Sequence, residues 1–355
     1  MKKLITITSL AVVAVVGTTQ AAAFTAGNLV VSRVGNGTSA LVNTGGEISL
    51  LEYSTAGSLA QTINISTTQT SGLQWSGSAT SEGAISLSAD RTQLTLVGYN
   101  TPFTGTGSLA SRTDAQAPRA MLSVSADGTF TSPTAVSAFT GNNIRSGVQS
   151  ASGAYLAGGT TGTIYRTGGT NTTVQSTVTN TRVANIFNGN LYFSTGSGAS
   201  RGVYGFSGLP TASSTPTLLL NTGASSSPYD FAFNSDGTRA YVAVDNSIMR
   251  FDFSGGSWSL TTTSATIGTA LTGLAVDFGV STDTIYTVNP TSLLSVTYSA
   301  GNFGTATTLA SAGSNYAFRG LEFTAVPEPA TYGVAFGGLL LALVVMRRRK
   351  AALGA

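Results

Sequence analysis

The sequence predicts an all-β protein: a β-propeller of six or seven blades, followed by a C-terminal transmembrane helix. Three observations lead to this prediction. Short β-prone runs alternate with turns rich in Gly, Asn, Asp and Ser. Two internal repeats have offsets of 45 and 37 residues, and a period of about 40–50 residues is typical of propeller blades. An uncharged apolar run lies near the C-terminus. A β-sandwich or a β-solenoid is the alternative fold, although a solenoid would show a shorter and stricter repeat.

The turns between the β-prone runs predict hairpins. In the clearest case, Asp236-Gly237 separates residues 231–234 from the apolar run 239–244. Glycine accepts the positive φ that tight hairpin turns need. The whole stretch 231–242 resembles the strand-turn-strand unit of bacterial propellers, in which an aromatic strand, a Ser-Asp-Gly turn and a Tyr-Val strand follow one another.

The repeats can be aligned without gaps. Residues 241–258 align on residues 286–303, and residues 143–159 align on residues 180–196. The matched pairs include Tyr241 with Tyr286, Trp258 with Phe303, Arg145 with Arg182, and Tyr155 with Tyr192. About 300 residues divided by a repeat of about 45 gives six or seven blades. We expect residues 28–31 to pair with residues 316–323, which would close the ring and remove its exposed edges.

The N-terminus has the pattern of a secretory signal peptide over residues 1–23. Lys2-Lys3 precedes an apolar stretch at residues 4–17, and small residues follow at 21–23. We therefore expect signal peptidase to cleave between Ala23 and Phe24. The extracellular propeller would then span residues 24–324.

The C-terminal segment, residues 325–355, has the pattern of a membrane anchor. Residues 330–346 are 17 uncharged residues, which as a helix span about 25 Å, at the short end for a bilayer core. The cluster Arg347, Arg348, Arg349 and Lys350 is costly to translocate and should hold the C-terminus in the cytoplasm. Pro327 and Pro329 keep the segment before the helix extended.

This tail resembles the PEP-CTERM sorting signal of Gram-negative bacteria, a short domain that is also labelled an ice-binding protein C-terminal domain. The resemblance rests on Pro327, Glu328 and Pro329, the short apolar helix and the terminal basic cluster, in that order. It covers about thirty residues and implies nothing about ice. It implies sorting by exosortase, a membrane-embedded cysteine transpeptidase-like enzyme, and a link to exopolysaccharide. The expected route is therefore export, anchoring in the inner membrane, and then the cell surface or extracellular matrix.

Composition excludes several classes of function. Without the six basic residues of the two termini and Glu328, the body has 11 basic and 13 acidic residues and no lysine, so no nucleic-acid partner is expected. The chain has no cysteine and no histidine. Nucleophilic sites of the Ser-His-Asp or Cys-His type and zinc sites of the usual kind are therefore excluded. We assign no metal and no cofactor.

Two kinds of candidate ligand-binding residue remain. A pair of carboxylates can hydrolyse a glycosidic bond. The candidate acids are Glu47, Glu52, Glu82, Asp90, Asp114 and Asp230, but nothing in the sequence brings two of them together, so we assign no catalytic residue. Trp75, in a polar and glycine-rich surrounding, is a candidate ligand contact. Trp258 matches Phe303 in the repeat and is expected in blade packing.

These observations favour a secreted cell-surface protein that binds or scaffolds the exopolysaccharide matrix. Its expected partners are signal peptidase, exosortase, the membrane through the C-terminal helix, and exopolysaccharide. The alternative is a carboxylate-dependent glycan hydrolase or lyase on the same fold.

Overall fold

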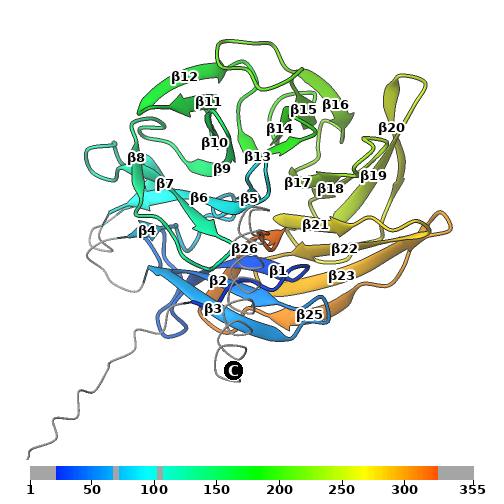
Figure 1. Ribbon diagram of the computed structural model, residues 1–355, viewed down its shortest axis with the longest axis horizontal. Helices are drawn as coiled ribbons and strands as arrows, with labels where there is room; N and C mark the ends of the chain where they lie inside the picture. Colours follow the sequence, from blue (N-terminus) through cyan, green and yellow to red (C-terminus); the bar gives the residue numbers. More distant parts are fainter. Residues whose placement is uncertain (1–20, 67–71, 102–106, 327–355) are drawn as a thin grey trace, which may run out of the picture.

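The computed structural model describes residues 21–66, 72–101 and 107–326, whose strands form six antiparallel sheets around a central axis (Figure 1). Each sheet is one blade of a β-propeller. The prediction of an all-β propeller is confirmed, and the number of blades is six. The helical structure of the described residues is a single 3₁₀ turn at Leu109–Ser111.

The first three blades are named from the axis outwards. Blade 1 consists of β26 (Tyr316–Phe323), β1 (Leu29–Gly35), β2 (Ile48–Tyr53) and β3 (Leu59–Ser66). Blade 2 consists of β4 (Leu73–Gln74) and β5 (Ser86–Leu87), which both pair with β6 (Gln93–Asn100), then β7 (Arg119–Ser125) and β8 (Thr134–Val136). Blade 3 consists of β9 (Ile144–Ser150), β10 (Gly153–Gly158), β11 (Gly162–Thr167) and β12 (Thr170–Gln175).

The remaining three blades follow the same plan. Blade 4 consists of β13 (Thr181–Phe187), β14 (Asn190–Thr195), β15 (Gly202–Gly205) and β16 (Thr217–Asn221). Blade 5 consists of β17 (Pro228–Phe233), β18 (Arg239–Val244), β19 (Ser247–Ser254) and β20 (Ser257–Thr263). Blade 6 consists of β21 (Gly273–Asp277), β22 (Thr282–Val288), β23 (Ser292–Ser299), β24 (Asn302–Phe303) and β25 (Thr307–Ser311).

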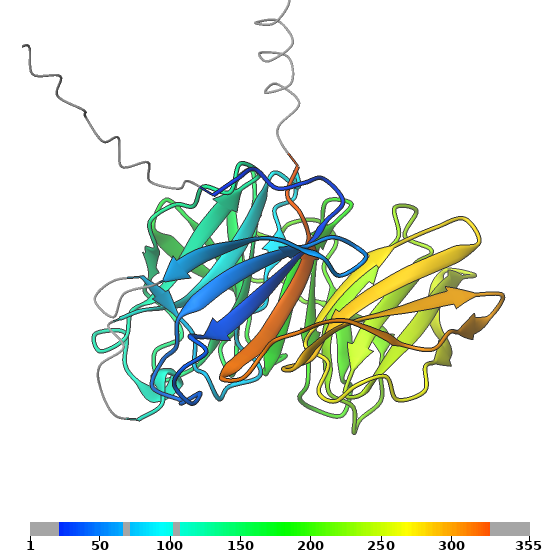
Figure 2. The same cartoon turned by 90° about the horizontal axis from the view of Figure 1, so that it is seen from below.

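The ring is closed by the last strand of the chain. β26 pairs with β1, with Leu29 opposite Phe323 and Gly35 opposite Tyr316. The predicted pairing of the two ends is therefore confirmed. Figure 2 shows the end of β26 and the start of the propeller chain on the same face of the disc. Closure removes the two edges that an open sheet would expose.

The internal repeats correspond to neighbouring blades. Tyr241 lies in β18 and Tyr286 in β22, both second strands, and each pairs with an alanine of the innermost strand. Trp258 pairs with Phe253 just as Phe303 pairs with Tyr298. Tyr155 and Tyr192 are likewise both third residues of second strands, β10 and β14. The two repeats found in the sequence are therefore structural repeats.

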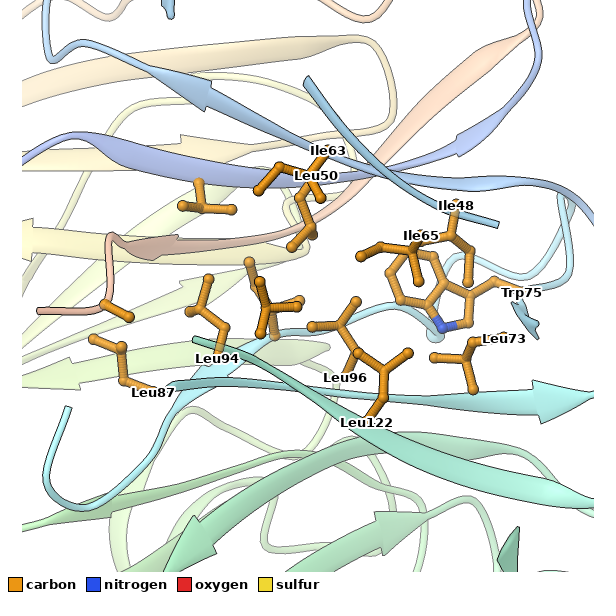
Figure 3. Close-up of a cluster of buried hydrophobic side chains, with 14 of the residues drawn as sticks. Ile48, Leu50, Ile63, Ile65, Leu73, Trp75, Leu87, Leu94, Leu96 and Leu122 are labelled. Atoms are coloured by element: carbon orange, nitrogen blue, oxygen red, sulfur yellow. The ribbon is translucent and has the colours of Figure 1, made fainter. Parts of the chain in front are cut away.

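The hydrophobic core lies between the blades, and Trp75 is part of it. The Trp75 indole is fully buried among the leucines and isoleucines of blades 1 and 2 (Figure 3). Its Nε1 donates a hydrogen bond to the Val97 carbonyl at 2.5 Å. The prediction that Trp75 contacts a ligand is wrong. A Cβ at Gly83 or Gly98 would come within 3.0 Å of the ring, so its glycine neighbours give the indole room to pack.

The described residues contain no helix long and apolar enough to cross a membrane. The expected helix at residues 330–346, and with it Pro327–Pro329 and Arg347–Lys350, lies outside the described residues, as does most of the signal peptide.

Candidate functional site

The innermost strand of each blade walls the central axis of the propeller, which is here called the channel and has a cavity at each end. The strands β5, β9, β13, β17, β21 and β26 contact one another in that cyclic order. Residues at the starts of these strands line one cavity, and residues at their ends line another. The six strands therefore all run in the same direction along the axis, and the channel has two chemically different ends.

The end at which the strands finish, here the phenylalanine end, opens into a cavity of about 360 Å³. In four consecutive blades, the innermost strand ends in a phenylalanine or is followed by one, and these four residues line the cavity: Phe187, Phe233, Phe278 and Phe323. Phe187, Phe278 and Phe323 are partly exposed. The Phe187 and Phe233 rings pack edge to face with centroids 5.3 Å apart, so part of each ring belongs to the core between blades.

Polar groups share the phenylalanine end. Asn185, Asn188, Asn234 and Glu322 line the cavity. The Asn188 amide donates to the Ser235 carbonyl at 2.9 Å, and the Asn185 side-chain oxygen accepts the Ile186 N–H at 2.9 Å. These bonds fix the amides in position. Aromatic faces combined with a few oriented hydrogen-bonding groups can hold a sugar, because its C–H face is apolar and its rim is hydroxylated.

Two carboxyl groups lie in the channel wall near this end. Burial raises the pKa of Glu322, although the nearby Arg91 guanidinium opposes the rise. Asp230 is 4% exposed, and burial raises its pKa well above the usual range, with the charge of Glu322 adding to the rise. Its two oxygens accept the backbone N–H groups of Phe231 (2.8 Å) and Leu274 (2.9 Å). Asp230 therefore joins β17 to β21, and its oxygens are already occupied.

The opposite end, here the arginine end, carries three guanidinium groups. Arg145 and Arg182 are the second residues of β9 and β13, and Arg319 lies in β26. The Arg182 guanidinium carbon is 3.9 Å from the ring centroid of Tyr229, a cation–π contact. Arg145 and Arg182 are close enough that the charge of Arg182 lowers the pKa of Arg145, after the larger effect of burial.

One carboxylate faces these arginines. Glu82 is 1% exposed, and its Oε2 accepts the Ser76 N–H at 3.0 Å. Its Oε1 accepts hydrogen bonds from the Tyr99 hydroxyl and from the Asn143 amide. Burial raises the pKa of Glu82, whereas these hydrogen bonds and then Arg319 lower it.

The predicted acidic candidates do not form a site together. Glu82 reaches the arginine end, and Asp230 lies at the β17–β21 junction. The other four candidates belong to blades 1 and 2. Glu47 precedes β2, Glu52 lies in β2, and Asp90 lies in a turn. Asp114 forms an ion pair with Arg119, with Oδ1 3.4 Å from Nη1. The carboxyl group near Asp230 is Glu322, which the sequence did not suggest.

The predicted signal cleavage site spans a change in burial. Ala23 is exposed, whereas Phe24 is 7% exposed, packs in the core, and donates its backbone N–H to the Ala126 carbonyl at 2.8 Å. Cleavage between these two residues stays a prediction.

Sequence reasoning missed both ends of the channel, although signals for each were present. The alignment of Arg145 on Arg182 marks one repeated arginine at the start of an innermost strand. Phenylalanine followed by a polar residue or glycine recurs at Phe187, Phe233, Phe278 and Phe323. Neither pattern reveals that the side chains share a cavity, because this depends on the circular arrangement of the blades.

Comparison with known proteins supports the fold alone. No protein-family description matches the chain, and no curated protein matches it. A chain of the nidogen/laminin complex is 9% identical with a TM-score of 0.50, covering 83% of this chain and 98% of that one. The GH74 enzyme of Niastella koreensis is 16% identical with a TM-score of 0.49, covering 78% and 46%. A protein from Lactobacillus plantarum is 11% identical with a TM-score of 0.47, covering 82% and 99%.

Proposed function

We propose that this protein is an exported, exosortase-sorted surface protein whose propeller binds polysaccharide of the extracellular matrix at the phenylalanine end of the channel. The observation that carries the proposal is the cavity of about 360 Å³ that four phenylalanines share with three asparagines and Glu322. A cavity of this size, with apolar faces and fixed amides, suits one or two sugar units of a longer chain.

The place at which the chain leaves the propeller supports a link between sorting and binding. Val326, the last described residue, donates its N–H to the carbonyl of Arg91, a residue that lines the same cavity. The sorting segment therefore continues from the rim of the phenylalanine end. While the tail holds the protein at the membrane, this end faces the bilayer, and removal of the tail frees it for the matrix.

Binding is tested by affinity electrophoresis of the mature protein in gels that contain purified exopolysaccharide. Phe187→Ala removes one aromatic face of the cavity and should abolish the retardation seen for the unaltered protein. Phe253→Ala is the matched control, because Phe253 is 41% exposed on blade 5 and does not line the cavity. Equal retardation of both variants, each shown to be folded by circular dichroism, would refute binding at this end.

Sorting is tested separately in cells with and without exosortase. Replacing Pro327, Glu328 and Pro329 with alanine should leave the protein anchored and unprocessed, and neutral residues in place of Arg347–Lys350 should disturb topology or retention. The measurements are the mass and the membrane fraction of the protein. An intact C-terminus in exosortase-positive cells would leave only an ordinary single-span anchor.

The raised pKa values of Glu322 and Asp230 at one end of the channel keep a glycan hydrolase as the second candidate. Asp230 is a poor partner for Glu322 in catalysis, since both of its oxygens accept backbone N–H groups. Glu322→Gln separates the two functions: a binding protein keeps its affinity and releases no sugar in either form. Release of reducing ends by the unaltered protein, but not by the variant, would establish the enzyme.

A further inference from the structure

The arginine end contains a second cavity that the proposed polysaccharide site does not use. It has a volume of about 10 Å³ and is lined by Glu82, Arg182, Tyr229 and Arg319, among others. A cavity of this volume holds about one water molecule or one monatomic ion.

The charges around this cavity do not balance. Arg145, Arg182 and Arg319 carry three positive charges, and Glu82 supplies one negative charge, which leaves an excess of two. Burial lowers the pKa of Arg182, the charge of Asp245 raises it and the charge of Arg201 lowers it. Arg201 and Asp245 therefore add one charge of each sign near Arg182 and leave the excess of two unchanged. Within the described residues, none of the three arginines forms an ion pair. Arg319 is buried, and Arg145 and Arg182 are half-buried, so solvent screens this excess only in part and it lowers stability.

The three arginines also leave the same donor unused. The Nε–H groups of Arg145, Arg182 and Arg319 are buried, and each lacks a hydrogen-bond partner among the described residues. Arg319 is 2% exposed, and its Nη2 is held by the Gly77 carbonyl at 2.7 Å. Arg182 uses its Nη1 on Ser227 Oγ at 2.7 Å. A buried guanidinium N–H without an acceptor loses the hydrogen bond that it makes in water.

A group in the cavity must accept hydrogen bonds from the arginines, and both a water molecule and a small anion can do so. A water molecule leaves the excess positive charge unchanged, and the nearest carboxylate, Glu82, already accepts from Ser76, Tyr99 and Asn143. A halide ion accepts several N–H groups at once and removes one excess positive charge.

We propose that this cavity is a site for a monatomic anion, chloride under ordinary conditions, held by Arg182 and Arg319, with Arg145 adding to the positive potential. The anion joins the start of β13 in blade 4 to β26 in blade 1, the strand that closes the ring. Chloride therefore stabilises the closed propeller, whatever binds at the phenylalanine end.

The first test is the urea midpoint of the mature protein at constant ionic strength, with sodium chloride or sodium bromide exchanged against sodium gluconate. An anion that binds only the folded state raises the folding equilibrium constant by about tenfold for each tenfold rise in its concentration above Kd. Chloride and bromide should give this saturable response, and gluconate, which is too large for the cavity, should give none. The same stability in all three salts overturns the proposal.

Two variants and one crystal make the test specific. Arg182→Gln should lose the chloride response, whereas Arg166→Gln should keep it, because Arg166 lies in β11 and bonds to the Gly169 and Ala135 carbonyls. A chloride response that persists in Arg182→Gln contradicts the assignment. Should that variant fail to fold, crystals of the unaltered protein grown in bromide decide: an anomalous peak in the cavity supports the site, and its absence refutes it.

Discussion

Replacing Trp75 with phenylalanine tests whether this residue holds blades 1 and 2 together or contacts a ligand. The indole is fully buried, and its Nε1 donates to the Val97 carbonyl in the neighbouring strand β6. Phenylalanine keeps most of the apolar contact but leaves that carbonyl without its partner. An unsatisfied buried acceptor costs about 1–3 kcal/mol, to which a small cavity adds. Trp75→Ala removes the whole ring and should cost about 3–5 kcal/mol.

The assay is urea unfolding followed by fluorescence in a Trp258→Phe background. The sequence has two tryptophans, so Trp75 is then the single indole. Its emission should be blue-shifted in the folded state and shift to the red on unfolding, because the ring moves from the core into water. The variant's own unfolding is followed by circular dichroism.

The burial argument is refuted by a specific pair of results. If Trp75 emits at the wavelength of a solvated indole in the folded protein, and Trp75→Phe leaves the urea midpoint unchanged, the ring is not in the core. Loss of polysaccharide retardation in a fully stable Trp75→Phe variant would also contradict burial and would restore the prediction that Trp75 contacts a ligand.

Three further predictions concern stability and processing. Burial raises the pKa of Asp230 in the folded state, so the folded protein holds a proton that the unfolded chain releases, and stability should fall as pH rises from about 4 through that raised pKa. Asp230→Asn should flatten this slope in urea midpoints measured across pH, and an equal slope in both proteins would contradict the assignment of the slope to Asp230. A Cβ at Gly320 would lie 2.8 Å from backbone atoms of the next blade, so Gly320→Ala should lower the free energy of unfolding by about 1–3 kcal/mol. Gly304→Ala meets a threonine hydroxyl that can rotate away and should lower it less. A larger loss in Gly304→Ala than in Gly320→Ala would show that the channel wall can adjust to the added methyl group. N-terminal sequencing of the exported protein should begin at Phe24, and a retained Met1 would count decisively against cleavage after Ala23.

Much of the fold could be read from local sequence. Turn chemistry such as Asp236-Gly237 fixes hairpins, and strands with alternating apolar residues define the sheets, because both depend on neighbours within a few residues. The repeats at Tyr241 and Tyr286 then gave the blade period. The length limited the blade count to six or seven, and the structure fixed it at six. The pairing of the chain ends followed from the need to protect edges.

The channel was decided by tertiary structure alone. Phe187, Phe233 and Phe278 are separated by about a blade each, and they meet only because the innermost strands converge on one axis. The same convergence brings Arg182 and Arg319, far apart in the chain, to one small cavity.

Trp75 is the position at which local reasoning failed, and the physical reason is packing. Its polar, glycine-rich sequence surrounding is typical of a loop, yet the ring is buried, and the clearance for it comes from Gly83 and Gly98. The chain by itself determines which segments form strands, since that choice rests on short-range geometry. Contacts between blades decide which side chains are buried, which are paired and which keep unused donors. These contacts form only when the blades pack around the axis.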